Sequence, residues 1–261
     1  MGMAFLAGTL YLSFLDPPFA VTLAGMASVY AGTSGWSYAS WKPDFYPAKL
    51  APAKFLSYYA TRLNSVEVNY TFRHFPTEKL LEGWIAATPA HFKFALKAHQ
   101  MITHIKRLRD TSDWLTRLCS SLRPLEDAGK LGPILFQLPP NLKCDVALLR
   151  EFLEDLPPGL HSAFEFRDAS WFCEEVYAAL RARNAALCQA ESEKLETPIL
   201  QTAKFTYLRL RKERYSPKEL ARLKSRVSEA AASGDVFVYF KHEETPEGAL
   251  YAEGLLSTSP R

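Results

Sequence analysis

The sequence predicts a single α/β domain built as a closed (β/α)8 barrel of the TIM type. From Val29 onward, eight short runs rich in β-branched and aromatic residues alternate with longer amphipathic stretches, the pattern of repeated strand–helix units. The length of 261 residues also suits one barrel of this kind. An open doubly wound sheet is the alternative, but it usually carries a G-x-G-x-x-G turn after its first strand, and residues 33–36 read Thr-Ser-Gly-Trp.

Eight strands are expected, separated in most cases by one amphipathic helix. The predicted strands cover residues 29–33, 65–69, 92–97, 133–138, 162–166, 185–189, 205–210 and 236–241. The predicted helices cover residues 52–63, 77–87, 113–122, 145–153, 174–182, 217–232 and 247–256. The stretch between strands six and seven is short and contains Pro198, so we expect its helix to be missing or reduced to a turn.

The first 25 residues differ from the rest of the chain. They are apolar and contain no Lys or Arg, and the first positive charge is Lys42. A signal peptide needs a basic segment before its apolar stretch, and Asp16 interrupts an apolar run that is too short to span a bilayer. We therefore interpret residues 1–25 as an N-terminal extension outside the fold, with Met26 as the natural start. We expect residues 26–261 to form the barrel domain of a cytoplasmic protein without membrane association.

The overall composition is that of an ordinary folded protein. Hydrophobic residues make up 48% of the chain, which excludes disordered and fibrous classes. A net charge of +3, from 31 Lys+Arg and 28 Asp+Glu, predicts neither a nucleic-acid coat protein nor a polybasic membrane anchor. The four cysteines contain no C-x-x-C pair, and we interpret them as reduced thiols.

Ionisable residues occur at the C-terminal ends of five predicted strands, where barrel enzymes carry their reacting groups. They are Glu67, Lys97, Glu165, Arg167, Arg209 and Lys241. A buried charge inside a strand is costly unless it is paired or solvated, so these positions predict a polar cup at one mouth of the barrel. A closed salt-bridge network that plugs the barrel is the structural alternative.

The balance of charge in this cup favours an anionic ligand, because two carboxylates face four cations. Guanidinium groups such as Arg167 and Arg209 bind phosphate or carboxylate bidentately. With Lys97 they are predicted to fix the anion, while Glu67 or Glu165 acts as general base or acid.

Further site residues come from loops and neighbouring strand ends. His104 is a candidate proton carrier, because the pKa of histidine lies near neutrality, although a purely structural hydrogen bond is an equal alternative. The loop at residues 35–47 holds five aromatic residues, of which we expect Trp36 and Tyr38 to contact a ligand. Other substrate contacts are expected from Asn69, Gln137, Trp171 and Lys241.

No cofactor is predicted for this cup. A divalent metal site needs several converging His, Asp and Glu ligands, and the nearby additions are His74, His104 and Asp168, each in a loop. A divalent metal is therefore a minor alternative. The outward helix faces show no apolar stripe beyond the barrel contact, so no particular oligomeric state is predicted.

Six ordered motifs resemble those of the domain-of-unknown-function 72 family, which includes YecE-like proteins. They are GTSGWSY at 32–38, Trp41 with FYP at 45–47, SVEVNYTF at 65–72, FKFALKAHQMITH at 92–104, LGPILFQLPP at 131–140 and FEFRDASW at 164–171. The resemblance implies a TIM-type barrel, sometimes with incomplete helices, and no established activity. This chain departs from the family at Arg211, where a His is common, and at Lys241-His242, where Asn-Asn is common.

The expected function is that of an enzyme, a hydrolase or isomerase acting on a small anionic or sugar-like substrate by carboxylate acid–base chemistry. Glycoside hydrolysis is one version, since it requires two carboxylates. One alternative is a metal-dependent nucleic-acid repair endonuclease, which is not favoured because the sequence supplies neither a clear basic groove nor a metal cluster. The other is a barrel that binds a ligand without turnover.

Overall fold

The computed structural model describes residues 27–191, 195–241 and 243–257. The predicted N-terminal extension, residues 1–25, lies outside the described residues. Within these ranges there are eight strands: β1 Val29–Thr33, β2 Ser65–Val68, β3 Lys93–Lys97, β4 Leu131–Gln137, β5 Ser162–Glu165, β6 Ala186–Ala190, β7 Phe205–Leu210 and β8 Asp235–Phe240. All eight lie where the sequence predicts a strand, with ends that differ by two residues at most.

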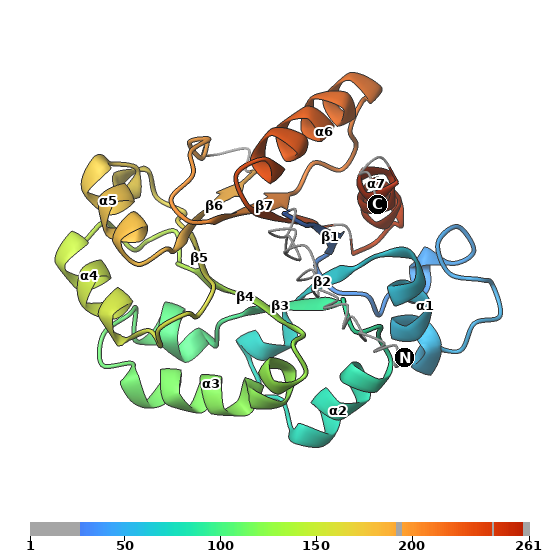
Figure 1. Ribbon diagram of the computed structural model, residues 1–261, viewed down its shortest axis with the longest axis horizontal. Coiled ribbons are helices and arrows are strands. Elements are labelled where there is room, and N and C mark those ends of the chain that lie inside the picture. The colour runs from blue at the N-terminus through green and yellow to red at the C-terminus, as the bar shows by residue number, and fades with distance from the viewer. Residues whose placement is uncertain (1–26, 192–194, 242, 258–261) are drawn as a thin grey trace, which may run out of the picture.

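The strands form one parallel sheet that closes into the predicted barrel. Their order is β1-β8-β7-β6-β5-β4-β3-β2, so each strand neighbours the next one along the chain. A single bridge between Ser34 and Glu67 joins the two ends of this series. Figure 1 shows the strands as a ring with the helices outside it.

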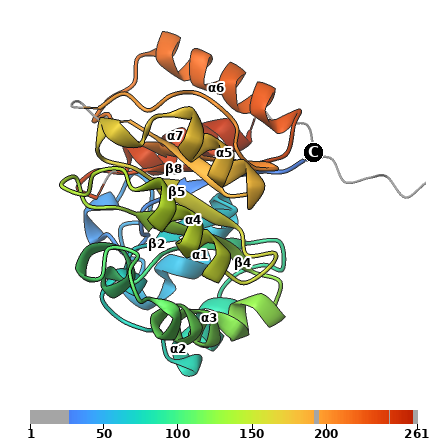
Figure 2. The ribbon, with the colours of Figure 1, turned by 90° about the vertical axis from the view of Figure 1, so that its left-hand side faces the viewer.

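In the described part of the chain, seven α-helices accompany the strands. They are α1 Phe55–Arg62, α2 Glu78–Ala86, α3 Ser112–Asp127, α4 Val146–Asp155, α5 Glu174–Ala182, α6 Pro217–Ala231 and α7 Glu247–Leu256. In the described part of the segment between β6 and β7 there is no helix, as the sequence predicts. Seen from the side, α3, α4, α5 and α6 follow one another over the outside of the sheet (Figure 2).

Local sequence explains where several helices begin and end. The side chains of Thr77 and Asp145 accept hydrogen bonds from backbone N–H groups in the first turns of α2 and α4. Ser216 and Glu219 form a reciprocal capping box on α6. One prediction was wrong here, because α3 continues past residue 122 and through Pro124. Its last turn buries Leu125 against the core, and that packing outweighs the hydrogen bond that proline removes.

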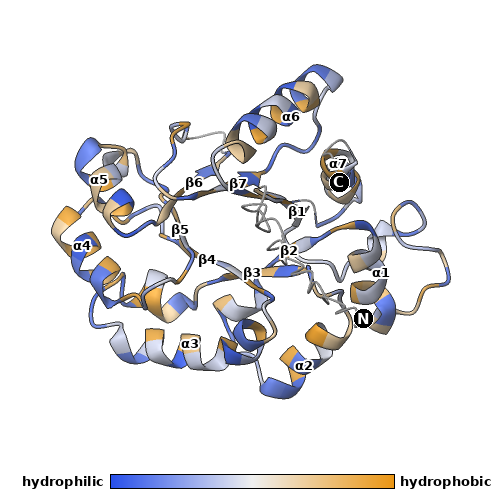
Figure 3. Ribbon diagram, in the orientation of Figure 1, coloured by the Kyte–Doolittle hydropathy of each residue, from blue (hydrophilic) through white to orange (hydrophobic). Residues whose placement is uncertain are grey.

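Two apolar layers stabilise the barrel. The larger one lies between strands and helices, and the helices accordingly carry both hydrophobic and hydrophilic residues (Figure 3). The smaller one fills the barrel interior, with alanines such as Ala95 and Ala163 on one side and aromatic rings of β7 and β8 on the other. The rings of Tyr207 and Tyr239 lie 5.3 Å apart there. Large rings facing small side chains fill the interior without a central pore.

Side chains, rather than a continuous backbone ladder, connect β1 to β2. The amide of Asn64 accepts from the backbone N–H of Ala31 (2.9 Å) and donates to the carbonyl of Val29 (2.8 Å). The hydroxyl of Tyr59 accepts from the backbone N–H of Thr33 (2.9 Å) and donates to the carbonyl of Ser65 (3.0 Å). These contacts satisfy backbone groups that an ordinary strand pair would satisfy directly.

Glycine is required on the β1 side of this junction. A Cβ added to Gly32 would lie 1.9 Å from the carbonyl oxygen of Ser65, far inside contact distance. The absence of a side chain therefore lets β2 approach β1 closely enough for the bridging hydrogen bonds.

We predict that Asn64→Ala lowers the free energy of unfolding by about 2 kcal/mol, because two hydrogen bonds are lost and two backbone groups lose their partners. Chemical denaturation measures the change. Asn141→Ala is the matched control, since Asn141 is exposed and accepts one long hydrogen bond from Arg107 (3.3 Å). If the two variants lose the same stability, the junction does not depend on Asn64.

Candidate functional site

Alternation along the strands brings a set of polar side chains into the barrel interior. Every second residue of a strand points inward. On five strands, the first of these inward residues is apolar, aromatic or small, and the last one, at or just after the C-terminal end of the strand, carries an ionisable or amide group. The series are Ala95–Lys97, Leu135–Gln137, Ala163–Glu165, Tyr207–Arg209–Arg211 and Tyr239–Lys241. The polar ends therefore meet at one mouth, where the sequence predicts a polar cup.

Arg209 lies at the centre of this cup between two carboxylates. Its Nη2 is 2.7 Å from Oε1 of Glu67, and its Nη1 pairs with Oε2 of Glu165. The three residues are 3%, 0% and 2% exposed, respectively, so the ion pairs are shielded from water. At such depth each charge depends on its partner, because an unpaired buried charge is strongly destabilising.

Arg209 also donates its Nε–H to Oε1 of Glu67 (3.2 Å), and two hydroxyl groups supply further hydrogen bonds to this carboxylate. Ser34 donates to Oε1 (2.6 Å), and Tyr207 donates to Oε2 (2.8 Å). Burial raises the pKa of Glu67, but the charge of Arg209 and these donors outweigh it and hold the pKa below its usual value. Glu67 is therefore ionised and fully bonded.

Glu165 is held in a similar way. Gln137 donates to its Oε1 (2.9 Å), and Nη2 of Arg211 pairs with the same atom at 3.0 Å. Burial raises its pKa, but Arg209 and Arg211 together lower it to about 2. Both carboxylates predicted as acid or base groups are thus ionised at neutral pH and occupied by donors.

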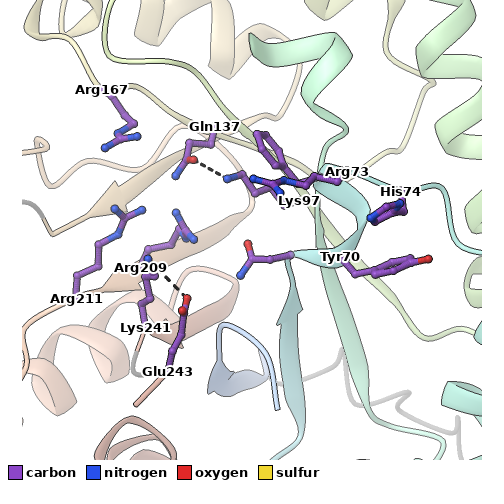
Figure 4. A pocket seen from close by; sticks show the side chains of 12 residues that line it. Tyr70, Arg73, His74, Lys97, Gln137, Arg167, Arg209, Arg211, Lys241 and Glu243 are labelled. Atoms are coloured by element: carbon purple, nitrogen blue, oxygen red, sulfur yellow. Dashed lines mark hydrogen bonds and ion pairs between the residues drawn. The ribbon is translucent and has the colours of Figure 1, made fainter. Parts of the chain in front are cut away.

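A cavity of about 410 Å³ opens at this mouth. Its walls are formed by Asn69, Tyr70, Phe72, Arg73, His74, Lys97, Gln137, Arg167, Arg209, Arg211, Lys241 and Glu243. Figure 4 shows Arg167, Arg209, Arg211 and Lys97 around one part of it. Glu67 and Glu165 do not line the cavity, because Gln137, Arg209 and Arg211 lie between them and the open space.

Three cations of the cavity wall have no carboxylate partner within ion-pair distance among the described residues: Arg73, Lys97 and Arg167. The other wall cations are paired. Lys241 lies 3.7 Å from Glu243, and Arg209 and Arg211 pair with the buried carboxylates. Arg73 and Arg167 are exposed, whereas Lys97 is half-buried. The wall therefore carries an excess of positive charge.

The surroundings of Lys97 change its pKa. Its Nζ donates to Oε1 of Gln137 (2.7 Å) and lies 4.0 Å from the ring centre of Phe72. Burial, and then the nearby charge of Arg209, lower the pKa of Lys97 to about 8. An amine with this pKa exchanges a proton near neutral pH. In its protonated form it can pair with an anionic ligand.

His104 lies close to the cavity without lining it. It belongs to a single π-helical turn, Met101–Ile105, and its ring meets that of Phe72 edge-on at 4.9 Å. Its Nδ1 is 2.9 Å from the hydroxyl oxygen of Thr103. Burial and the charges of Lys97 and Arg167 lower the pKa of His104, so it is mainly neutral at pH 7.

The structure places three predicted aromatic contacts away from the cavity. Trp171 is fully buried, stacks on Phe166 at 4.7 Å and donates its Nε1–H to the carbonyl of Leu142 (2.8 Å). Trp36 packs edge-on against Trp84. Tyr38 donates to the carbonyl of Ser34 (2.8 Å). None of the three lines the cavity, while Asn69, Lys97, Gln137, Arg167, Arg209 and Lys241 all do.

Sequence reasoning missed several wall residues. Arg211 could have been found, because it lies two positions after Arg209 and therefore faces the same side of β7. Tyr70 and Arg73 follow β2 in a turn, where no periodicity indicates which side chains face inward. His74, which the sequence offers as a possible metal ligand, lines the wall beside them.

Across residues 27–191, 195–241 and 243–257, no three His, Cys, Asp or Glu side chains form a group suited to a metal ion. None of the helices in that part of the chain has the length and apolar character needed to cross a membrane.

Comparisons with known proteins agree with the fold and the motifs. The family described as "Protein of unknown function DUF72" matches residues 30–259. The UPF0759 protein YunF of Bacillus subtilis is 31% identical over an alignment of 159 residues that covers 57% of this chain and 54% of YunF, so the match spans about half of that relative.

Solved structures extend the similarity over most of the chain. A DUF72 family protein from Thermotoga maritima superimposes with a TM-score of 0.78 and 28% identity, covering 88% of this chain and 98% of its own. A DUF72 family protein from Enterococcus faecalis gives a TM-score of 0.76 at 19% identity, covering 89% and 97%. By its family match over nearly the whole described region, this chain belongs to the DUF72 family of proteins of unknown function.

Proposed function

We propose that this protein is an enzyme that binds a small anionic substrate, one carrying a phosphate or carboxylate group, at the mouth of its barrel. The observation that supports the proposal is the placement of Arg73, Lys97 and Arg167 around one cavity without a carboxylate partner among the described residues. A cluster of like charges is unfavourable until an anion neutralises it. Charge-assisted hydrogen bonds from guanidinium groups supply both affinity and orientation for such a ligand.

The size of the cavity fits this class of ligand. A volume of about 410 Å³ lies in the range typical of small-molecule sites. The amides of Asn69 and Gln137 line it beside the cations, and each offers donors and acceptors for hydroxyl groups of a sugar-like substrate. The cytoplasmic location expected from the sequence is retained as part of the proposal.

The acid–base chemistry is assigned differently from the sequence-based expectation. Glu67 and Glu165 are ionised acceptors with lowered pKa values, so neither holds a proton to donate at neutral pH. We assign them the positioning of Arg209, which stands between them. This arrangement disfavours glycoside hydrolysis, which needs a protonated carboxyl group and substrate, rather than an arginine, between the two carboxylates.

Lys97 is the group best suited to move a proton. Its pKa of about 8 lies close to physiological pH, and its Nζ is at the cavity wall. Neutral His104 lies nearby as a second candidate. A hydrolase and an isomerase both need such a proton transfer, and the proposal covers either class.

Binding of pyrophosphate, followed by calorimetry, tests the proposal. Arg167→Gln is expected to weaken binding by about 10-fold or more, because a charge-assisted hydrogen bond contributes about 1.5–3 kcal/mol. Arg123→Gln is the control, since Arg123 is exposed on α3 shortly before β4 begins and thus lies at the opposite mouth. Equal affinity in the two variants would contradict the proposed site.

A second prediction concerns pH. A bound anion favours protonated Lys97, so affinity is expected to fall as pH rises from 7 to 9, through the pKa of about 8. Sulfate is the appropriate probe, because its own charge is constant over this range. Lys97→Met should bind more weakly at pH 7 and lose most of this pH dependence, whereas Lys93→Met, at the other end of β3, should keep it. An unchanged slope in Lys97→Met would remove Lys97 from the site.

A further inference from the structure

The cavity has an aromatic part in addition to its cationic part. Tyr70 is 45% exposed although its ring is large and mostly apolar, and it lines the cavity together with His74. The two rings are stacked, with centroids 4.9 Å apart and planes inclined by 28°. Among the residues that the structure describes, four large hydrophobic side chains are exposed, Tyr70, Ile105, Ile199 and Leu250, and of these four only Tyr70 belongs to the cavity wall.

The backbone fixes this aromatic pair relative to the cations. Tyr70 begins a 3-10 turn, Tyr70–Phe72, and its carbonyl accepts hydrogen bonds from the backbone N–H groups of Arg73 and His74, each at 3.2 Å. Thr71 in the same turn donates its hydroxyl to the carbonyl of Lys97 (2.7 Å). One short turn therefore carries an aromatic ring and a cation, and it is anchored to the strand that carries a second cation.

The aromatic pair lies at one side of the cavity, next to Arg73, and the cationic part extends from Arg73 and Lys97 to the far side. In Figure 4, Tyr70 and His74 are on the opposite side from Arg167 and Arg211. A ligand that contacts both parts must therefore carry an anionic group at one end and a flat, apolar group at the other. A simple phosphorylated sugar has no group of the second kind.

We propose that the ligand is a nucleoside monophosphate, with its phosphate among Arg73, Lys97 and Arg167 and its base stacked on Tyr70. This inference rests on the proposed anion-binding function and names the class of ligand. Bases stack on aromatic side chains whatever their identity, since every base has a π-face. His74 supports the ring of Tyr70 from one side, so a base would extend an existing stack.

Calorimetric titration of the whole chain with AMP, UMP and ribose 5-phosphate tests the inference. Ribose 5-phosphate carries the same sugar and phosphate without a base. In the unmodified protein AMP and UMP should bind more tightly than ribose 5-phosphate. Tyr70→Ala should weaken AMP and UMP by about 5- to 100-fold and leave ribose 5-phosphate unchanged, while Tyr70→Phe should keep the affinity of the unmodified protein.

Equal affinity for AMP and ribose 5-phosphate, or an equal loss for both in Tyr70→Ala, would overturn the nucleotide assignment while leaving anion binding intact. Much tighter binding of a single-stranded hexanucleotide than of AMP would also overturn it, because the base and phosphate would then belong to a strand. Failure of the underlying function gives a different pattern. In that case none of the three phosphates binds, or Arg167→Gln leaves all three affinities unchanged.

Discussion

Arg209 connects two carboxylates inside the barrel, and the shape and charge of the cavity depend on this contact. Glu67, Glu165 and Arg209 come from β2, β5 and β7, so their ion pairs link strands that are distant in the sequence. Burial leaves each charge dependent on the others, because water cannot replace a missing partner. The same contacts hold the guanidinium of Arg209 in one orientation at the floor of the cavity.

The charge of the cavity follows from this arrangement. The two carboxylates are neutralised by Arg209 and Arg211, and neither faces the open space. The remaining wall cations therefore act on a ligand without a competing negative charge, apart from Glu243 beside Lys241. Burial also brings the pKa of Lys97 near neutrality, so one wall group both attracts an anion and exchanges a proton.

Local rules predict the barrel and the inner side chains well. A period of two along each strand indicates that Lys97 and Gln137 face the same interior as Arg209, and parallel strands bring their C-terminal ends together. The same rules do not say how a buried group is paired. Whether Glu165 acts as an acid depends on the two arginines across the barrel, which is information about tertiary contacts. Turn residues such as Tyr70 follow no period at all.

The free energy of unfolding of Arg209→Met, alone and combined with Glu67→Gln and Glu165→Gln, shows whether two buried carboxylates hold Arg209 in place. The single variant should lose about 3–5 kcal/mol or fail to fold, because Glu67 loses its ion-pair partner and Glu165 keeps Arg211 alone. Neutralising both carboxylates should restore most of the loss. A triple variant as unstable as the single one, or a single variant as stable as the unmodified protein, would contradict this arrangement.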